Sequence, residues 1–185
     1  MPATVTIAPI VRQLLVVALA AALLSLPSHA SSERDALFDA LKNAPSEIEA
    51  EKIEDEIWKS WLAEAPTADI RTKVDTAMER RDSYDLQGAK DLLDEVVEEA
   101  PGYSEGWNQR AFILFLQGNY EASLEDIERA LELEPRHFGA LSGKALIFMT
   151  LGRIKLGQEV LRTAIAIHPF LKERDMLIEP QGVDL

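Results

Sequence analysis

Apolar and small residues recur along this chain at a fixed interval in the sequence, which we call the repeat period. Each repeat contains two runs in which apolar side chains recur at spacings of three and four, which is the pattern of an amphipathic helix. Pro101, Pro135 and Pro169 each follow the second run, and the two intervals between them are equal. A strict period of this length, with two helices in each copy, predicts an all-α, right-handed helical solenoid of antiparallel helix pairs.

Three units are in register, 70–103, 104–137 and 138–171. Small residues stand at matching places in them, where the two helices of a pair are expected to approach closely. These residues are Ala77, Ala111 and Ala145 in the first helix, Ala89, Ser123 and Gly157 early in the second, and Val96, Ala130 and Ala164 late in the second. Gly118 and Gly152 fall where the first helix must stop, because glycine adopts a left-handed conformation at least cost.

A further helix pair is predicted within residues 31–69, ahead of the registered units. Its first helix covers 33–43, and its second begins at a capping box formed by Ser46 and Glu49. The second helix carries an apolar stripe that includes Trp58 and Trp61. The pair is interpreted as a degenerate repeat or an N-terminal cap, since the end units of a stack lack one neighbour. A short helix and tail are expected over 172–185.

Residues 1–30 have the pattern of a secretory signal peptide. Arg12 precedes an apolar run over 14–26, and Ser28-His29-Ala30 places small residues before a cleavage site after Ala30. The apolar run is too short to span a bilayer, which favours a cleaved leader over the alternative, an uncleaved membrane anchor. We therefore expect a periplasmic or secreted protein without stable membrane insertion after cleavage.

Charge and cysteine content narrow the possible partners. The net charge of −13, from 32 acidic and 19 basic residues, disfavours nucleic acid and anionic lipid as partners. The chain has no cysteine, so it can carry neither disulfides nor the lipid of a lipoprotein.

No motif for catalysis, for a cofactor or for a metal is found. His137 and His168 stand in turns beside prolines and have no helical partner of the kind that zinc motifs use. They are interpreted as turn residues at repeat boundaries. Acidic runs such as Asp94-Glu95 alternate with leucine and valine, which is typical of a solvated helix face. We therefore expect a protein that is not an enzyme, with no catalytic, cofactor-binding or metal-binding residues.

The middle unit resembles the tetratricopeptide repeat (TPR) family. The residues that carry the resemblance are Trp107, Ala111, Gly118, Tyr120, Ser123, Ile127, Ala130 and Pro135. The third unit departs from the family at Leu141, where Trp is typical. The first unit departs most, with Tyr84 at the glycine place and Lys73 at the Trp place. With its leader, the chain resembles small exported bacterial TPR proteins.

The resemblance implies a concave groove lined by the first helix of each unit. Carried over residue by residue, it nominates a partner-binding set: Met78, Asn108, Gln109, Phe112, Phe115, Leu116, Leu146 and Met149. The apolar members would form the floor, and the two amides could meet a peptide backbone. The alternative is that the N-terminal pair, with Trp58 and Trp61, folds over this face and makes Phe112 and Phe115 core residues.

The resulting functional prediction is a non-enzymatic scaffold or adaptor in the bacterial periplasm that binds a peptide or partner helix in the groove. The alternative is a structural subunit of an envelope complex or homo-oligomer whose apolar face is permanently buried. Self-association is considered because the segment after residue 171 is too short to cover the last helix fully.

Overall fold

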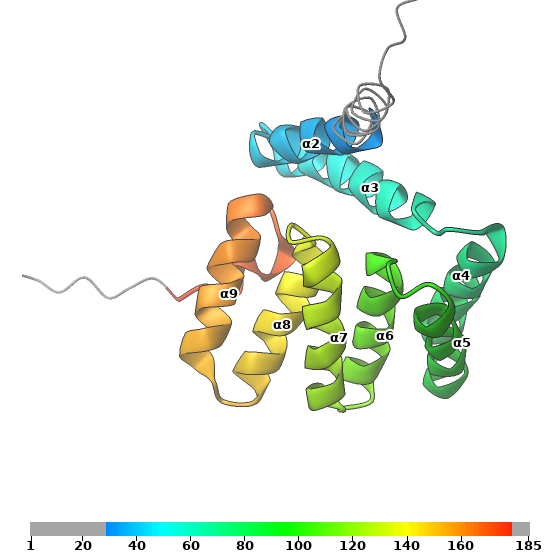
Figure 1. The fold of residues 1–185 in the computed structure, drawn as a ribbon. Coiled ribbons are helices and arrows are strands. Elements are labelled where there is room, and N and C mark those ends of the chain that lie inside the picture. The colour runs from blue at the N-terminus through cyan, green and yellow to red at the C-terminus, as the bar shows by residue number, and fades with distance from the viewer. Residues whose placement is uncertain (1–28, 179–185) are drawn as a thin grey trace, which may run out of the picture. The chain divides into compact units, whose positions relative to one another are not determined.

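The computed structural model describes residues 29–178, which are helical and contain no β-strand (Figure 1). The chain divides into two units, 1–36 and 37–185, and every contact described below lies within the second. The all-α solenoid predicted from the sequence is confirmed. The described helices are α2 (His29–Lys42), α3 (Glu47–Ala63), α4 (Ala68–Asp82), α5 (Leu86–Glu99), α6 (Ser104–Leu116), α7 (Tyr120–Leu133), α8 (Phe138–Thr150), α9 (Ile154–Ile167) and a 3₁₀ helix, η1 (Lys172–Met176).

Helices α4 to α9 form three antiparallel pairs, and each pair also packs against the next (Figure 1). The small residues that recur in the sequence lie where two helices of a pair meet, and all nine are buried. At one of these places the Ser123 hydroxyl donates a hydrogen bond to the Ala111 carbonyl, 2.7 Å away. At another, a Cβ added to Gly157 would lie 2.9 Å from the Ala145 carbonyl oxygen. The period in the sequence is therefore a period of close helix contacts.

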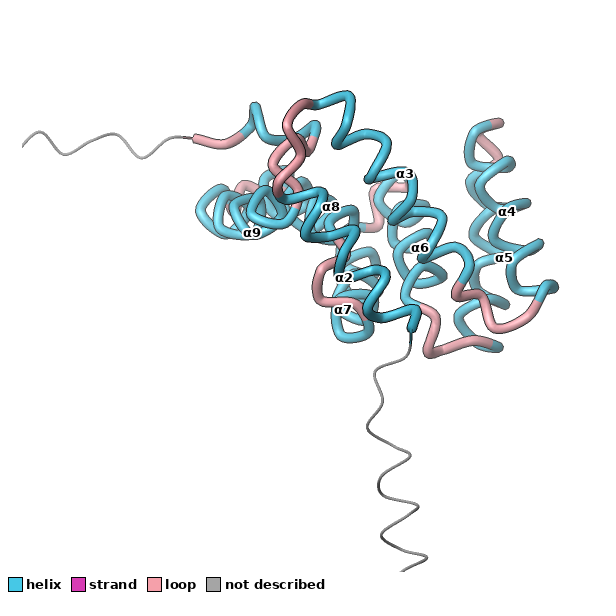
Figure 2. Tube along the Cα trace, turned by 90° about the horizontal axis from the view of Figure 1, so that it is seen from above, coloured by secondary structure: helices cyan, strands magenta, loops and turns pink. Residues whose placement is uncertain are grey.

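Helix α3 is not stacked as another registered repeat. It lies against the ends of α6 and α8, near the residues that begin α8 (Figure 2). The N-cap predicted for it is present, because the Ser46 hydroxyl accepts a hydrogen bond from the Glu49 amide at 3.3 Å. Thr67 caps α4 in the same way through the Ile70 amide at 3.2 Å.

The two ends of the chain differ in part from the sequence predictions. Helix α2 begins at His29 rather than at residue 33. The predicted C-terminal helix is only the five-residue turn η1, after which the backbone becomes extended at Leu177. The leader pattern over 1–28 and the tail over 179–185 lie outside the described residues. Among the described helices, none combines the length and the apolar character needed to cross a bilayer.

The three turns between paired helices share one backbone geometry. Gly118 and Gly152 have φ values of +75° and +74°, and Tyr84 occupies the same place in the first pair with φ +61°. A side chain with a Cβ is strained in this left-handed region, by about 1–2 kcal/mol. The Tyr84 side chain is 90% exposed, so contacts of its ring do not offset the strain.

We predict that Tyr84→Gly stabilises the protein by about 1 kcal/mol, because it removes the left-handed strain and loses little packing. Urea unfolding should show a higher midpoint with an unchanged m-value. Gly118→Ala is the matched control and should lower the midpoint by a similar amount. A loss of stability in Tyr84→Gly would contradict the prediction.

Candidate functional site: an apolar groove with one closed end

One cavity of about 370 Å³ lies over the first helices of the repeats. Helices α6 and α8 form its floor, α4 forms one side, and α3 and the segment after α9 form one end. The lining side chains are mainly apolar, and those used below are Trp58, Met78, Phe112, Phe115, Phe138 and Leu146. A concave, mostly apolar cavity of this size is typical of a binding site.

Six of the eight residues nominated from the sequence line this cavity: Met78, Asn108, Gln109, Phe112, Phe115 and Leu146. Leu116 and Met149 do not line it. Leu116 ends α6 and is 44% exposed outside the cavity. Met149 turns towards α9, where its sulfur accepts a hydrogen bond from Gln158 at 3.5 Å and its side chain lies over Gly157.

Several lining residues lie outside the nominated partner-binding set. They are Glu54 and Trp58 of α3, Leu171, Lys172 and Glu173 after α9, and the small residues Gly139, Ser142 and Gly143 of α8. The residues of α3, Lys172 and Glu173 lie outside the three repeat units, and Leu171 is the last residue of the third. The small residues stand at groove places of the third unit, but only the structure shows that they leave space.

Aromatic packing holds α3 at the closed end of the groove. The Trp61 ring stacks on His137 with centroids 4.0 Å apart and planes at 10°. Trp58 meets Phe138 edge-on at 5.6 Å and 88°. Gly139 makes this approach possible, because a Cβ there would lie 2.8 Å from the Trp58 ring. Trp61, His137 and Phe138 are fully buried.

The rest of the groove is open. Phe112 is 43% exposed, and the Arg81 guanidinium lies 5.4 Å from the centre of its ring. Helix α3 therefore closes one end and does not cover the floor. The sequence left open whether the N-terminal helix pair leaves the groove open or folds over it and makes Phe112 and Phe115 core residues. Helix α3, the second helix of that pair, leaves Phe112 outside the core, whereas Phe115 packs partly into the core beside Tyr120.

A buried carboxylate beneath the floor fixes its polar groups. Glu105 is fully buried and accepts hydrogen bonds from Asn108 Nδ2 at 3.3 Å and Gln109 Nε2 at 2.5 Å. Its other contact is His137 Nε2 at 2.9 Å. Because His137 Nδ1 accepts from the Ala140 amide, Nε2 carries the proton and donates to Glu105.

These bonds limit what the two groove amides can offer a ligand. The Gln109 oxygen also accepts from Arg81 Nη1 at 3.2 Å, so both ends of that amide are engaged. Asn108 donates one of its two N–H groups to Glu105 and retains its oxygen as an acceptor. The groove therefore presents mainly apolar surface, with fewer free donors than the sequence suggests.

A second histidine–carboxylate pair joins α3 to the end of α9. His168 Nε2 lies 3.0 Å from Glu54 Oε2, and Trp58 Nε1 donates to Glu54 Oε1 at 3.2 Å. The hydrogen bond from His168 lowers the pKa of Glu54 below its ordinary value, an effect that burial opposes and the Trp58 bond reinforces. This pair and the one at Glu105 are structural, and no group of three metal-binding side chains occurs in residues 29–178.

Comparison with known proteins identifies related sequences. The family model described as Tetratricopeptide repeat matches residues 104–137. A TPR repeat-containing protein of Rhizobium etli is 37% identical over 135 residues, which cover 73% of this chain and 66% of that protein. The Tetratricopeptide repeat protein 36 homolog of Nematostella vectensis is 32% identical over 68 residues, 37% of each chain. The chain thus spans about two thirds of the first relative's length and just over a third of the second's.

Among solved structures, the Sgt2 TPR domain from Aspergillus fumigatus superimposes with a TM-score of 0.53. The match covers 65% of this chain and 91% of that domain, at 21% identity. At this identity the similarity concerns the fold alone.

We predict that Glu54→Gln destabilises the protein by about 1 kcal/mol at pH 6, because it weakens a hydrogen bond to a charged group that is mostly shielded from water. The pKa of Glu54 is lowered in the folded state, so the carboxylate's contribution is fully present above its ordinary pKa of 4.5 and is lost as the pH falls through the lowered value. The difference from wild type, measured by urea unfolding, should therefore shrink below pH 4.5.

Glu51→Gln on the exposed side of α3 is the control for the change in net charge. It should alter the unfolding free energy little at any pH. A Glu54→Gln effect that grew on acidification would be opposite in sign to that expected.

Proposed function

We propose, from the premise that the chain belongs to the tetratricopeptide repeat family, that it is a non-enzymatic adaptor that binds a partner protein in its groove. Proteins of this family generally mediate protein–protein interactions and typically act as scaffolds without enzymatic activity. The observation that carries the proposal is the exposed Phe112 ring over a concave, mostly apolar cavity. Exposed apolar patches on soluble proteins commonly mark interaction sites.

The shape of the groove favours a short apolar segment as the ligand. Trp58 and Leu171 stand at the closed end, so a bound segment is expected to enter past Phe112 and stop there. The cavity volume of about 370 Å³ suits a few large side chains rather than the whole face of a long helix. Charged side chains of both signs surround the opening, so apolar contact rather than net charge is expected to dominate affinity.

Gly143 offers a way to test the groove without damaging the core. A Cβ added at this position would meet only Ile127 Cδ1, at an ordinary contact distance of 3.6 Å. A larger side chain there would extend into the cavity, and the exchange of a helical glycine for leucine favours the helix. We predict that Gly143→Leu is at least as stable as wild type and loses partner capture from an extract of the producing cells by about tenfold or more.

Phe112→Asp should have the same effect on capture, because it places a charge on the floor. Ile48→Asp is the matched control, since Ile48 is 67% exposed on α3 and lies outside the cavity. Capture that survives both groove variants in folded protein would refute the groove as the binding site. Equal loss in all three variants would indicate a non-specific effect.

We also propose that the protein acts in the bacterial periplasm. The support is the leader pattern of Arg12, the apolar run over 14–26 and the small residues that end at Ala30. The protein recovered from the periplasmic fraction should begin at Ser31 when its N-terminus is sequenced. Recovery in the cytoplasm with Met1 retained would contradict the export proposal and leave the groove proposal unaffected.

A further inference from the structure

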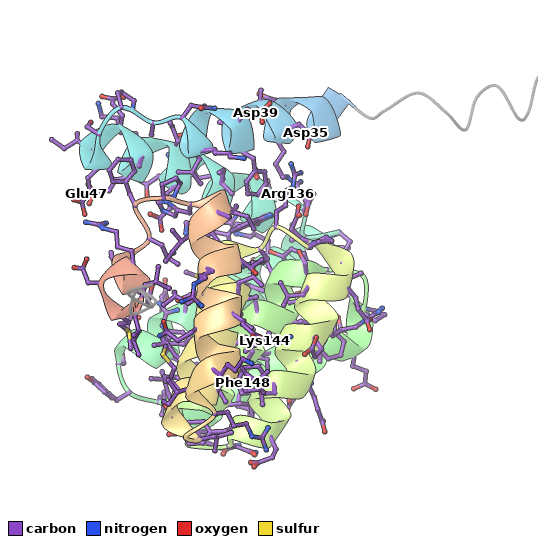
Figure 3. All side chains as sticks on the ribbon, turned by 90° about the vertical axis from the view of Figure 1, so that its left-hand side faces the viewer. Asp35, Asp39, Glu47, Arg136, Lys144 and Phe148 are labelled. Atoms are coloured by element: carbon purple, nitrogen blue, oxygen red, sulfur yellow. The ribbon has the colours of Figure 1, made fainter. Side chains whose placement is uncertain are left out.

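An ionic contact recurs between successive helix pairs with the repeat period. Arg110 of α6 reaches back to Asp94 of α5, with Nη1 and Oδ1 3.1 Å apart. Lys144 of α8, which is labelled in Figure 3, reaches back to Glu128 of α7, with Nζ and Oε1 2.6 Å apart. In both cases the second helix of one pair supplies the acid and the first helix of the next pair supplies the cation. We call this the inter-repeat ion pair.

The last pair reverses this chemistry. Arg162 of α9 stands one repeat period after Glu128, so a cation replaces the acid. Gln158 stands one repeat period after Leu124, which packs against the apolar core between the second and third pairs. At these two positions the preceding repeat has residues that contact the next helix, Leu124 by packing and Glu128 by an ion pair. Gln158 and Arg162 instead form hydrogen bonds with main-chain groups.

The chain's own C-terminal segment takes up these groups. Arg162 Nη2 donates to the Ile178 carbonyl at 3.0 Å. The Gln158 side-chain amide forms two hydrogen bonds with the main chain of the same segment. It donates to the Met176 carbonyl at 2.9 Å and accepts from the Ile178 amide at 2.7 Å. We call residues 171–178 the C-terminal strap.

In the sequence, the strap stands where the first helix of another repeat would begin. It starts with the last residue of the third unit, and Ile178 stands one repeat period after Lys144. Leu171 is buried at its start, and Arg174 ties it to Glu47 of α3 at 3.3 Å. A 3₁₀ turn followed by extended backbone, held by side chains, therefore stands where the repeat register would place an α-helix.

The other end of the repeat stack lacks the complementary half of the ion pair. Thr76 of α4 stands one repeat period before Arg110, where a cation would be needed to receive an acid from a preceding helix. A second copy stacked end to end would thus bring Thr76 against Arg162 and would have to displace the strap. Neither contact resembles those between the repeats.

We infer that Gln158, Arg162 and the strap close the C-terminal end of the stack to end-on association with a second copy. The inference does not depend on the groove or on any partner that the groove binds. It bears on the choice between an adaptor and a self-associating subunit, because it argues against self-association through the ends of the repeat stack.

A variant that carries, at both ends of the repeat stack, the residues found at the contacts between repeats tests this inference directly. The variant with Gln158→Leu, Arg162→Glu and Thr76→Lys recreates the residues of α7 and the charge of Lys144. We expect wild type to sediment as a monomer at about 200 µM, and the triple variant to associate at least tenfold more tightly in low salt. Because one end meets the other, the association should continue beyond a dimer, and salt should weaken it.

Arg153→Glu, which changes charge at the start of α9 away from the strap contacts, is the control and should remain monomeric. Wild type that associates as tightly as the triple variant, or a folded triple variant that stays monomeric, would overturn the inference. If the triple variant does not fold, amide exchange at Ile178 in Gln158→Leu decides the matter. Exchange at least fivefold faster than in wild type supports the strap contact, and unchanged exchange refutes it.

Discussion

The buried carboxylate of Glu105 is the constraint on which the arrangement around the groove depends. A carboxylate without access to water is tolerated only when hydrogen-bond donors surround it, and three side chains supply them here. In doing so they fix the amides of Asn108 and Gln109 along α6 and hold the His137 ring in one orientation. The fixed imidazole is the surface on which Trp61 stacks. One buried charge thus connects the floor of the groove to the helix that closes its end.

This connection determines what the groove can recognise. Asn108 and Gln109 each spend one of their two N–H groups on Glu105, so part of the hydrogen-bonding capacity of the floor is used within the protein. What remains for a ligand is mainly the aromatic ring of Phe112 and the aliphatic side chains beside it, with the Asn108 oxygen and the second N–H of each amide as the polar groups. Recognition in such a groove depends on the shape and apolar area of the ligand more than on its backbone polarity.

Periodicity in the sequence was sufficient to predict the repeat architecture and most of the groove floor. It locates the small residues at helix contacts because those contacts recur with the repeat, and the family resemblance then places Phe112 and Leu146 on one face. Neither source locates α3, since its position depends on contacts made by side chains outside the repeats, chiefly Trp58 and Trp61. The inward turn of Met149 likewise depends on a local feature, the missing side chain of Gly157, which leaves room for it in this pair.

Gly139 explains why α3 is part of this fold rather than an appended helix. It stands one repeat period after Glu105, at the place where the second unit carries its buried acid. The third unit has no side chain there, and the vacant space admits the Trp58 ring. His168, the histidine of the third unit, instead pairs with Glu54, a carboxylate that belongs to α3. Helix α3 therefore supplies, from outside the repeats, the acid that α8 lacks, Glu54, and a large side chain, Trp58, for the space above Gly139. Because α3 is held there, the groove has a closed end.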